Sequence, residues 1–291
     1  GGGRGNMAWA APEADVYVVC LVNRREGEDK QAGISWIGDF VEIIRANSGK
    51  IQLLSSKPES WEVWEGKDHL MEPNHLNPAV FGFNTIIVAA FPDEELIHAW
   101  WGSDRVFERM KCRSPIDTLG VFVFDGITEA TDITDAGRIA FGDKYVLFEF
   151  HKMLCFKPVQ QYCDNFRRYC EATRVQPMLA DSVKNTLVNE FPLDAVCATS
   201  WKQLLEAKLW RFSDVFQATM VPSREQHSLC LCVLVPMHEA SLADIQKARK
   251  LFALKDTMKA MATDGADLNF IKTASAKGID VGTKGARLHN N

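Results

Sequence analysis

Two stretches of the chain carry nearly the same sequence, and the rest is interpreted outward from them. Residues 91–104 read FPDEELIHAWWGSD and are followed by LGVFVF at 119–124, while residues 201–214 read WKQLLEAKLWRFSD and are followed by LCLCVL at 229–234. A constant spacing of 110 separates four equivalent pairs: Phe91 and Trp201, Trp100 and Trp210, Ser103 and Ser213, and Leu119 and Leu229. Such an internal offset indicates a duplicated structural unit. The sequence therefore predicts two copies of one fold.

The composition is that of a globular protein. The 291 residues are 46% hydrophobic and 24% charged, which suits about two domains of roughly 100 to 200 residues each. The net charge is −5, and no long basic run is interleaved with aromatics, so we expect no nucleic-acid partner. No apolar run reaches the roughly 18 residues of a membrane span. We expect a cytoplasmic protein, with a trimmed organelle precursor as the alternative.

Both copies alternate strand and helix patterns in the order β-α-β-β-α-β. This order is typical of a four-stranded antiparallel sheet with two helices on one face. The sequence therefore predicts an α+β fold of two fused ferredoxin-like repeats. The expected segments are a disordered leader or expression remnant (1–14), repeat 1 (15–126), a linker (127–142), a diverged repeat 2 (143–237), and a C-terminal helix and tail (238–291).

The second helix of each repeat gives two conflicting alignments. The Trp-x-x-Ser-Asp motif matches at a spacing of 110, whereas an apolar pattern in the same helix matches better at 109. We therefore expect one continuous helix at 202–219 in the second copy, with a one-residue slip inside it. The apolar pattern pairs Leu96, Trp100 and Phe107 with Leu205, Leu209 and Phe216.

The predicted strands are apolar at nearly every position. An antiparallel sheet with helices on one face and water on the other should instead alternate apolar and polar residues. Something must therefore cover the second face, because an apolar patch of that size is rarely left exposed on a soluble protein. We predict that the two repeats pack sheet to sheet as a pseudo-dimeric barrel, or that each pairs with a second chain. The strands concerned are 16–22, 86–90, 121–124, 146–148 and 229–235.

The first repeat resembles the dimeric α/β-barrel superfamily of ferredoxin-like units, nearest its small bacterial branch of unknown function. The resemblance depends on WEVWEG at 61–66, FPD at 91–93, AWWGS at 99–103 and GVFVFDG at 120–126. It implies that two units pair through their open sheet faces. The second repeat keeps the same order of strands and helices but few of these motifs. It resembles a diverged copy of the first repeat that completes the barrel. The superfamily includes cofactor-free monooxygenases, isomerases, haem-using enzymes and proteins without known activity, so the fold alone does not assign a function.

Candidate site residues come from aromatic, histidine and arginine positions. Large rings near a sheet suit an apolar pocket for a planar ligand, and an arginine can bind an anionic substrate. We take Tyr17, Trp36, Trp61, Trp100 and Arg113 as candidate ligand-binding residues. Ordinary core packing of the rings and a surface position for the arginine are the alternatives.

The candidate catalytic residues are His75, His151 and Tyr17. His75 lies in a polar loop at 65–78, where functional residues concentrate on a rigid scaffold. His151 follows Glu149 by two residues in a strand, which places both on one face as a candidate general base and its carboxylate. A solvated loop histidine is the alternative for His75.

Metal and cofactor motifs are absent from the sequence. The eight cysteines form no Cys-x-x-Cys pair, and most fall in apolar patterns where a reduced thiol packs as a small hydrophobe. The chain has no glycine-rich phosphate loop, His-Glu-x-x-His or Gly-x-Ser-x-Gly. We predict no metal and no cofactor.

Three functional hypotheses follow. The first is a small-molecule-binding or stress-type protein whose ligand is small and apolar or aromatic. The second is a cofactor-independent monooxygenase or isomerase acting on an aromatic or polyketide-like substrate. The third is a structural subunit of a larger assembly. The first includes self-association or a protein partner through the C-terminal tail, and the third uses the diverged repeat and the tail as its docking surface.

Overall fold

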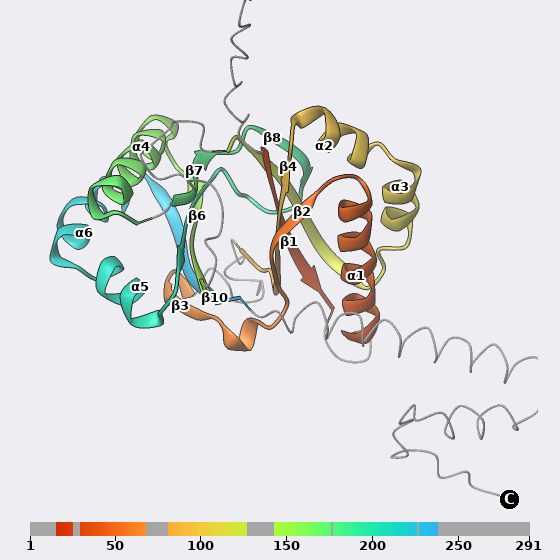
Figure 1. The fold of residues 1–291 in the computed structure, drawn as a ribbon, viewed down its shortest axis with the longest axis horizontal. Coiled ribbons are helices and arrows are strands. Elements are labelled where there is room, and N and C mark those ends of the chain that lie inside the picture. Colours follow the sequence, from red (N-terminus) through yellow and green to blue (C-terminus); the bar gives the residue numbers. More distant parts are fainter. Residues whose placement is uncertain are drawn as a thin grey trace, which may run out of the picture. The chain divides into compact units, whose positions relative to one another are not determined.

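The computed structural model describes residues 16–25, 30–67, 81–126, 143–175, 177–225 and 227–237 (Figure 1). Within these ranges each repeat follows the predicted order, with one additional short strand, β3 or β8. No helix there combines the length and apolar character needed to cross a membrane. Repeat 1 contains β1 (Val16–Arg24), α1 (Lys30–Ala46), β2 (Lys50–Ser55), a 3-10 turn (Pro58–Ser60), β3 (Glu62–Glu65), β4 (Thr85–Phe91), α2 (Glu94–Trp101), α3 (Asp104–Lys111) and β5 (Ile116–Phe124). Repeat 2 contains β6 (Tyr145–Met153), α4 (Phe156–Thr173), β7 (Pro177–Ser182), β8 (Asn185–Asn189), β9 (Ala195–Trp201), α5 (Leu204–Arg211), α6 (Asp214–Thr219), α7 (Pro222–Glu225) and β10 (Ser228–Pro236).

The strands form two antiparallel five-stranded sheets, which confirms the α+β fold. Sheet A has the order β2-β4-β1-β5-β8, and sheet B has the order β3-β10-β6-β9-β7. Each sheet therefore takes four strands from one repeat and a fifth from the other. Strand β3 of repeat 1 pairs with β10 (Val63 opposite Val233), and β8 of repeat 2 pairs with β5 (Val188 opposite Val121). This exchange joins the two repeats through main-chain hydrogen bonds.

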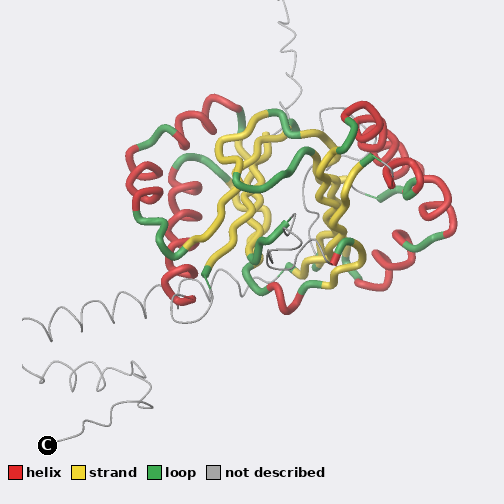
Figure 2. Tube along the Cα trace, turned by 180° about the vertical axis from the view of Figure 1, so that it is seen from behind, coloured by secondary structure: helices red, strands yellow, loops and turns green. Residues whose placement is uncertain are grey.

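The two sheets pack face to face, as the strand composition predicts. One apolar core draws residues from both sheets, including Val19 and Phe122 from sheet A and Phe148 and Val233 from sheet B. Two further cores lie between each sheet and its own helices. Figures 1 and 2 show the strands at the centre with the helices outside them. Every central strand is thus buried on both faces, which explains its continuous apolar sequence.

The predicted continuous helix with a one-residue slip is wrong. The helix is broken in both repeats, and Ser103 and Ser213 each cap the second piece by accepting a hydrogen bond from the backbone N–H three residues on. The spacing of 110 then holds throughout, because buried Ile97, Trp100 and Val106 correspond to buried Ala207, Trp210 and Phe216. Each pair that gave the spacing of 109 contains one exposed residue, namely Leu205, Leu209 or Phe107.

Some predicted segments cannot be compared with the structure. The leader (1–14), the linker (127–142), and the C-terminal helix and tail (238–291) lie outside the described residues. Association through the tail falls outside them as well. The segment boundaries therefore stay predictions.

Candidate functional site

The five predicted ligand-binding residues lie in three separate places. Tyr17 and Trp61 belong to the core between the sheets, where the Trp61 indole donates to Ser55 Oγ at 2.7 Å. Trp36 and Trp100 belong to the core between sheet A and its helices. Sheet A separates the two pairs, so they cannot line one pocket together.

Arg113 lies near the surface after α3. Its Nη2 is 2.7 Å from Glu190 Oε2, and the same carboxylate oxygen accepts a hydrogen bond from the Leu119 backbone N–H at 2.8 Å. Glu190 directly follows the exchanged strand β8. Arg113 therefore helps hold that strand in sheet A.

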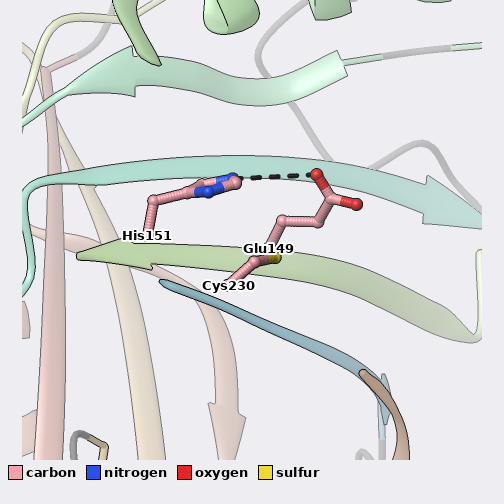
Figure 3. A group of neighbouring side chains, drawn as sticks. All are labelled: Glu149, His151 and Cys230. Atoms are coloured by element: carbon pink, nitrogen blue, oxygen red, sulfur yellow. Dashed lines mark ion pairs between the residues drawn. The ribbon is translucent and has the colours of Figure 1, made fainter. Parts of the chain in front are cut away.

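The predicted pair of Glu149 and His151 lies on the helix side of sheet B and is almost fully buried. Both side chains come from β6, as strand alternation predicts, and His151 Nε2 is 3.7 Å from Glu149 Oε2 (Figure 3). His151 Nδ1 lies 3.2 Å from Ser228 Oγ on β10, and the Tyr162 hydroxyl of α4 donates to Glu149 Oε2. The other candidate histidine, His75, lies outside the described residues.

Two buried arginines complete this cluster. Arg211 Nε is 3.0 Å from Glu149 Oε1, and Arg224 Nη2 is 3.9 Å from the same oxygen. Both guanidinium groups also bind Glu65, at the end of the exchanged strand β3, at 2.5 to 2.8 Å. Two carboxylates therefore face two guanidinium groups. We call Glu65, Glu149, His151, Arg211 and Arg224 the ionic cluster.

The arginine pair determines the ionisation of the cluster. Burial by itself would raise the pKa of Glu149, but Arg211 and Arg224 outweigh this effect and hold that pKa well below its usual range. Burial lowers the pKa of His151, and Glu149 offsets this only in part. Burial and Glu149 both raise the pKa of Tyr162. At neutral pH Glu149 is therefore ionised beside the two guanidinium groups, and His151 is neutral.

Sequence reasoning missed both arginines and Glu65. Arg211 and Arg224 lie 146 and 159 residues from Glu65 along the chain. Both belong to short helices, α5 and α7, where a charged residue normally faces water. The one available signal was the spacing of 110, which places Arg211 beside the buried Trp210 in a helix whose repeat 1 counterpart has Trp101 at that position.

A metal is a further candidate occupant of this region. Ligand atoms of Glu149, His151 and Cys230 lie within 4.8 Å of one another. However, the only carboxylate of the three already faces both guanidinium groups, and burial raises the pKa of the Cys230 thiol. A cation would meet positive charge and a protonated thiol, so these residues do not suit one. The arrangement instead fixes β3 against the helices of repeat 2.

Replacing His151 by glutamine should make the protein less sensitive to mild acid. Since the folded pKa of His151 lies below the unfolded value of about 6.5, the unfolded state gains a proton first as the pH falls. The free energy of unfolding of the wild type should therefore decrease as the pH falls below about 6.5. This residue contributes up to ~1.4 kcal/mol per pH unit to the decrease. Urea unfolding at pH 8, 7, 6 and 5 checks this. A His151→Gln slope equal to that of the wild type between pH 7 and 5 would contradict the assignment.

Two clefts lie away from the ionic cluster. One, of about 430 Å³, is at the end of the barrel, where its lining includes Lys152, Thr186, Leu193 and Asp194. The other, of about 420 Å³, lies between α1 and α3, with Asp39, Glu108 and Arg109 among its lining residues. Neither is lined by the predicted aromatic residues.

The outer surface of α5 and α6 exposes four large apolar side chains. Leu205, Leu209, Phe212 and Val215 are 51% to 66% exposed. We call these four residues the α5–α6 face. The Trp64 ring of β3 lies 5.3 Å from that of Phe212 and extends the apolar surface.

Repeat 1 shows that the fold does not require this apolar surface. At the spacing of 110, the four equivalent positions are Glu95, Ala99, Gly102 and Arg105, all of them exposed. The inward positions Ile97, Trp100 and Val106 have apolar equivalents in repeat 2, namely Ala207, Trp210 and Phe216. At these four positions the repeats therefore differ in residues that contact solvent rather than the core.

No protein-family model and no curated protein sequence matches the chain. Solved structures do resemble it. An anthrone oxidase-like protein is 12% identical, with 78% of this chain and 95% of that chain covered and a TM-score of 0.47. A heme-bound variant of DypB from Rhodococcus jostii is 11% identical, with 81% and 97% covered and a TM-score of 0.43. A mutant chlorite dismutase from Candidatus Nitrospira defluvii is 9% identical, with 82% and 97% covered and a TM-score of 0.43.

Similarity at this level concerns the fold alone, and no activity follows from it for this chain. The arrangement of two ferredoxin-like units joined through their sheet faces is the one implied by the dimeric α/β-barrel resemblance. The nearer assignment of repeat 1 to the small bacterial branch stays a prediction.

Proposed function

We propose that the chain is a structural subunit that binds another protein chain through the α5–α6 face. The observation that carries this proposal is the contrast between the repeats. Four apolar side chains stand on the outside of repeat 2 where repeat 1 has Glu95, Ala99, Gly102 and Arg105. Exposed apolar patches of this kind mark interaction sites on soluble proteins.

The interior of the barrel supports the same proposal. An apolar ligand would need space between the sheets, whereas the described side chains of that region are buried against one another in one apolar core. Phe148 and Phe150 stack at 5.2 Å between ring centroids, and Phe83 meets Phe150 edge-on at the same distance. Tyr17 and Trp61 are part of this packing.

The buried histidine also favours a binding role over catalysis. A general base must converge on a pocket that a substrate can enter. His151 is instead fully buried between Glu149, Ser228 and Tyr162, and neither described cleft includes it. An oxygenase or isomerase that uses His151 would need this cluster to open first.

Exchanging the face for its repeat 1 counterpart tests the proposed function. The variant carries Leu205→Glu, Leu209→Ala, Phe212→Gly and Val215→Arg, all at positions that face solvent. Native mass spectrometry of gently purified protein from the natural source should show the wild type in a complex with another chain and the variant as a free chain. Unchanged complexes in the variant, or a free wild-type chain, would contradict the proposal. Circular dichroism must first show that the variant is folded.

A second candidate function is small-molecule binding, which the cleft at the end of the barrel favours. Its volume of about 430 Å³ lies in the usual range for small-ligand sites of about 300 to 1,000 Å³. Its lining mixes Lys152 and Asp194 with apolar Leu193. The same mass spectra test this candidate, because a retained small molecule adds a fixed mass to both the wild type and the face-exchanged variant.

A further inference from the structure

We infer that the partner of the α5–α6 face is a second copy of this chain, packed about a two-fold axis that passes near Leu209. The inference rests on the proposed function and names its partner. It starts from the spacing of the apolar residues along α5. Leu205 and Phe212 lie four residues before and three residues after Leu209, which is the most exposed of the three.

An antiparallel copy of the same helix fits this spacing. A two-fold axis near Leu209 sets this side chain against its own equivalent and Leu205 against Phe212 of the second copy. Isologous interfaces need this kind of self-complementarity, since one surface contacts itself. The apolar residues then form the centre of the contact, and Trp64 beside Phe212 widens it.

The charges at the two ends of α5 also complement each other in this arrangement. Lys202 is exposed just before the N-terminus of α5, and Asp214 is exposed at the start of α6, just after its C-terminus. Antiparallel packing brings Lys202 of each copy near Asp214 of the other. A parallel arrangement would instead place like charges together. The charge pattern therefore selects the antiparallel, two-fold pairing.

Repeat 1 does not offer a second surface of this kind. Its equivalent residues place Glu95 and Arg105 at the positions of Leu205 and Val215. A contact made through repeat 2 alone closes after two copies. We therefore expect a dimer rather than a growing chain of subunits.

Sedimentation velocity of the purified full-length chain tests the inference. At about 100 µM the wild type should be dimeric, and Leu209→Asp should weaken the dimer about 30-fold or more, as expected for a residue at the centre of an interface. Lys202→Glu and Asp214→Lys should each weaken it, whereas the double variant should restore it, because the pairing is then reversed but still complementary. Phe107→Asp is the matched control, because this residue lies on repeat 1 outside the α5–α6 face, and it should leave the dimer intact.

Cross-linking tests the position of the axis. Cys112 and Cys155 are the exposed cysteines and are replaced by serine first. Leu209→Cys should then form a disulfide between copies on oxidation, since the bond requires Cα atoms within about 7 Å, whereas Leu205→Cys should not.

The outcomes separate this inference from the proposed function. A dimer that resists Leu209→Asp uses a different surface, which overturns the inference. A purified chain that is monomeric in sedimentation velocity also overturns the inference. The proposed function then stands if the complex from the natural source still depends on the α5–α6 face. If the purified chain is monomeric and the natural complex does not depend on the α5–α6 face, both the inference and the proposed function are overturned.

Discussion

Replacing Glu149 by glutamine is expected to destabilise the fold by about 3 to 5 kcal/mol. Glutamine keeps the size of the side chain but removes its charge. Arg211 and Arg224 are both almost fully buried, and only the half-buried Glu65 would remain to balance them. Breaking a buried ion pair from one side leaves a charge that neither water nor protein compensates. The loss is a large fraction of the roughly 5 to 15 kcal/mol that stabilises a typical domain.

Urea unfolding at pH 7.5 measures this effect, and Glu190→Gln is the matched control. Glu190 has the corresponding role at sheet A, because it follows the exchanged strand β8 of repeat 2 and binds Arg113 of repeat 1. Because the side chains of Arg113 and Glu190 are both about one-third exposed, water can take over the lost contact. The control substitution should lower the free energy of unfolding by about 1 kcal/mol or less. Equal losses in the two variants would show that the ionic cluster does not depend on its burial.

Much of the architecture could be predicted because the strand sequences show that both faces of each sheet are buried. Residues such as Val19 and Phe122 are apolar where a half-exposed sheet would be polar, and this pattern requires a second covering layer. The strand exchange could not be predicted in the same way. Strand β3 is only four residues long, and its sequence EVWE has a charged residue at each end, like an ordinary surface connection. Its pairing with β10 joins residues about 170 positions apart, which no local pattern encodes.

The helix register failed for a specific reason. Leu205 and Leu209 are as hydrophobic as core residues, and helical periodicity assigns such residues to the buried face. The capping serines Ser103 and Ser213 carry the better signal, because each fixes where a helix starts. Once the caps set the register, Leu205 and Leu209 are assigned to the exposed face of the helix, where they do not contribute to the core. The error in the prediction and the candidate interface therefore have the same origin.

The candidate site was predictable only within one strand. Alternation along β6 brings Glu149 and His151 to one face, and this follows from the sequence alone. The arginines that determine their ionisation come from α5 and α7, and the third partner, Glu65, comes from the other repeat. Electrostatic partners across such distances require the tertiary structure.

Replacing Phe150 by alanine is the second substitution with a large expected effect, about 3 to 5 kcal/mol of lost stability. Phe150 is fully buried between the sheets, where it stacks on Phe148 and meets Phe83 edge-on. Its removal leaves an apolar cavity, because close-packed neighbours relax only partly. Such a cavity stays dry and can bind a molecule like benzene.

Thermal unfolding with and without benzene therefore separates a filled barrel from a ligand-binding one. Benzene should raise the melting temperature of Phe150→Ala but leave that of the wild type unchanged, since only a ligand that binds the folded state stabilises it. Phe107→Ala is the matched control, because this ring is 60% exposed and contacts Lys111 at the surface, so it should cost about 0.5 kcal/mol. If benzene stabilised the wild type, the space between the sheets would contain a cavity of its own. The small-molecule hypothesis would then gain over the structural one, because a preformed apolar cavity inside the barrel is what the first hypothesis requires.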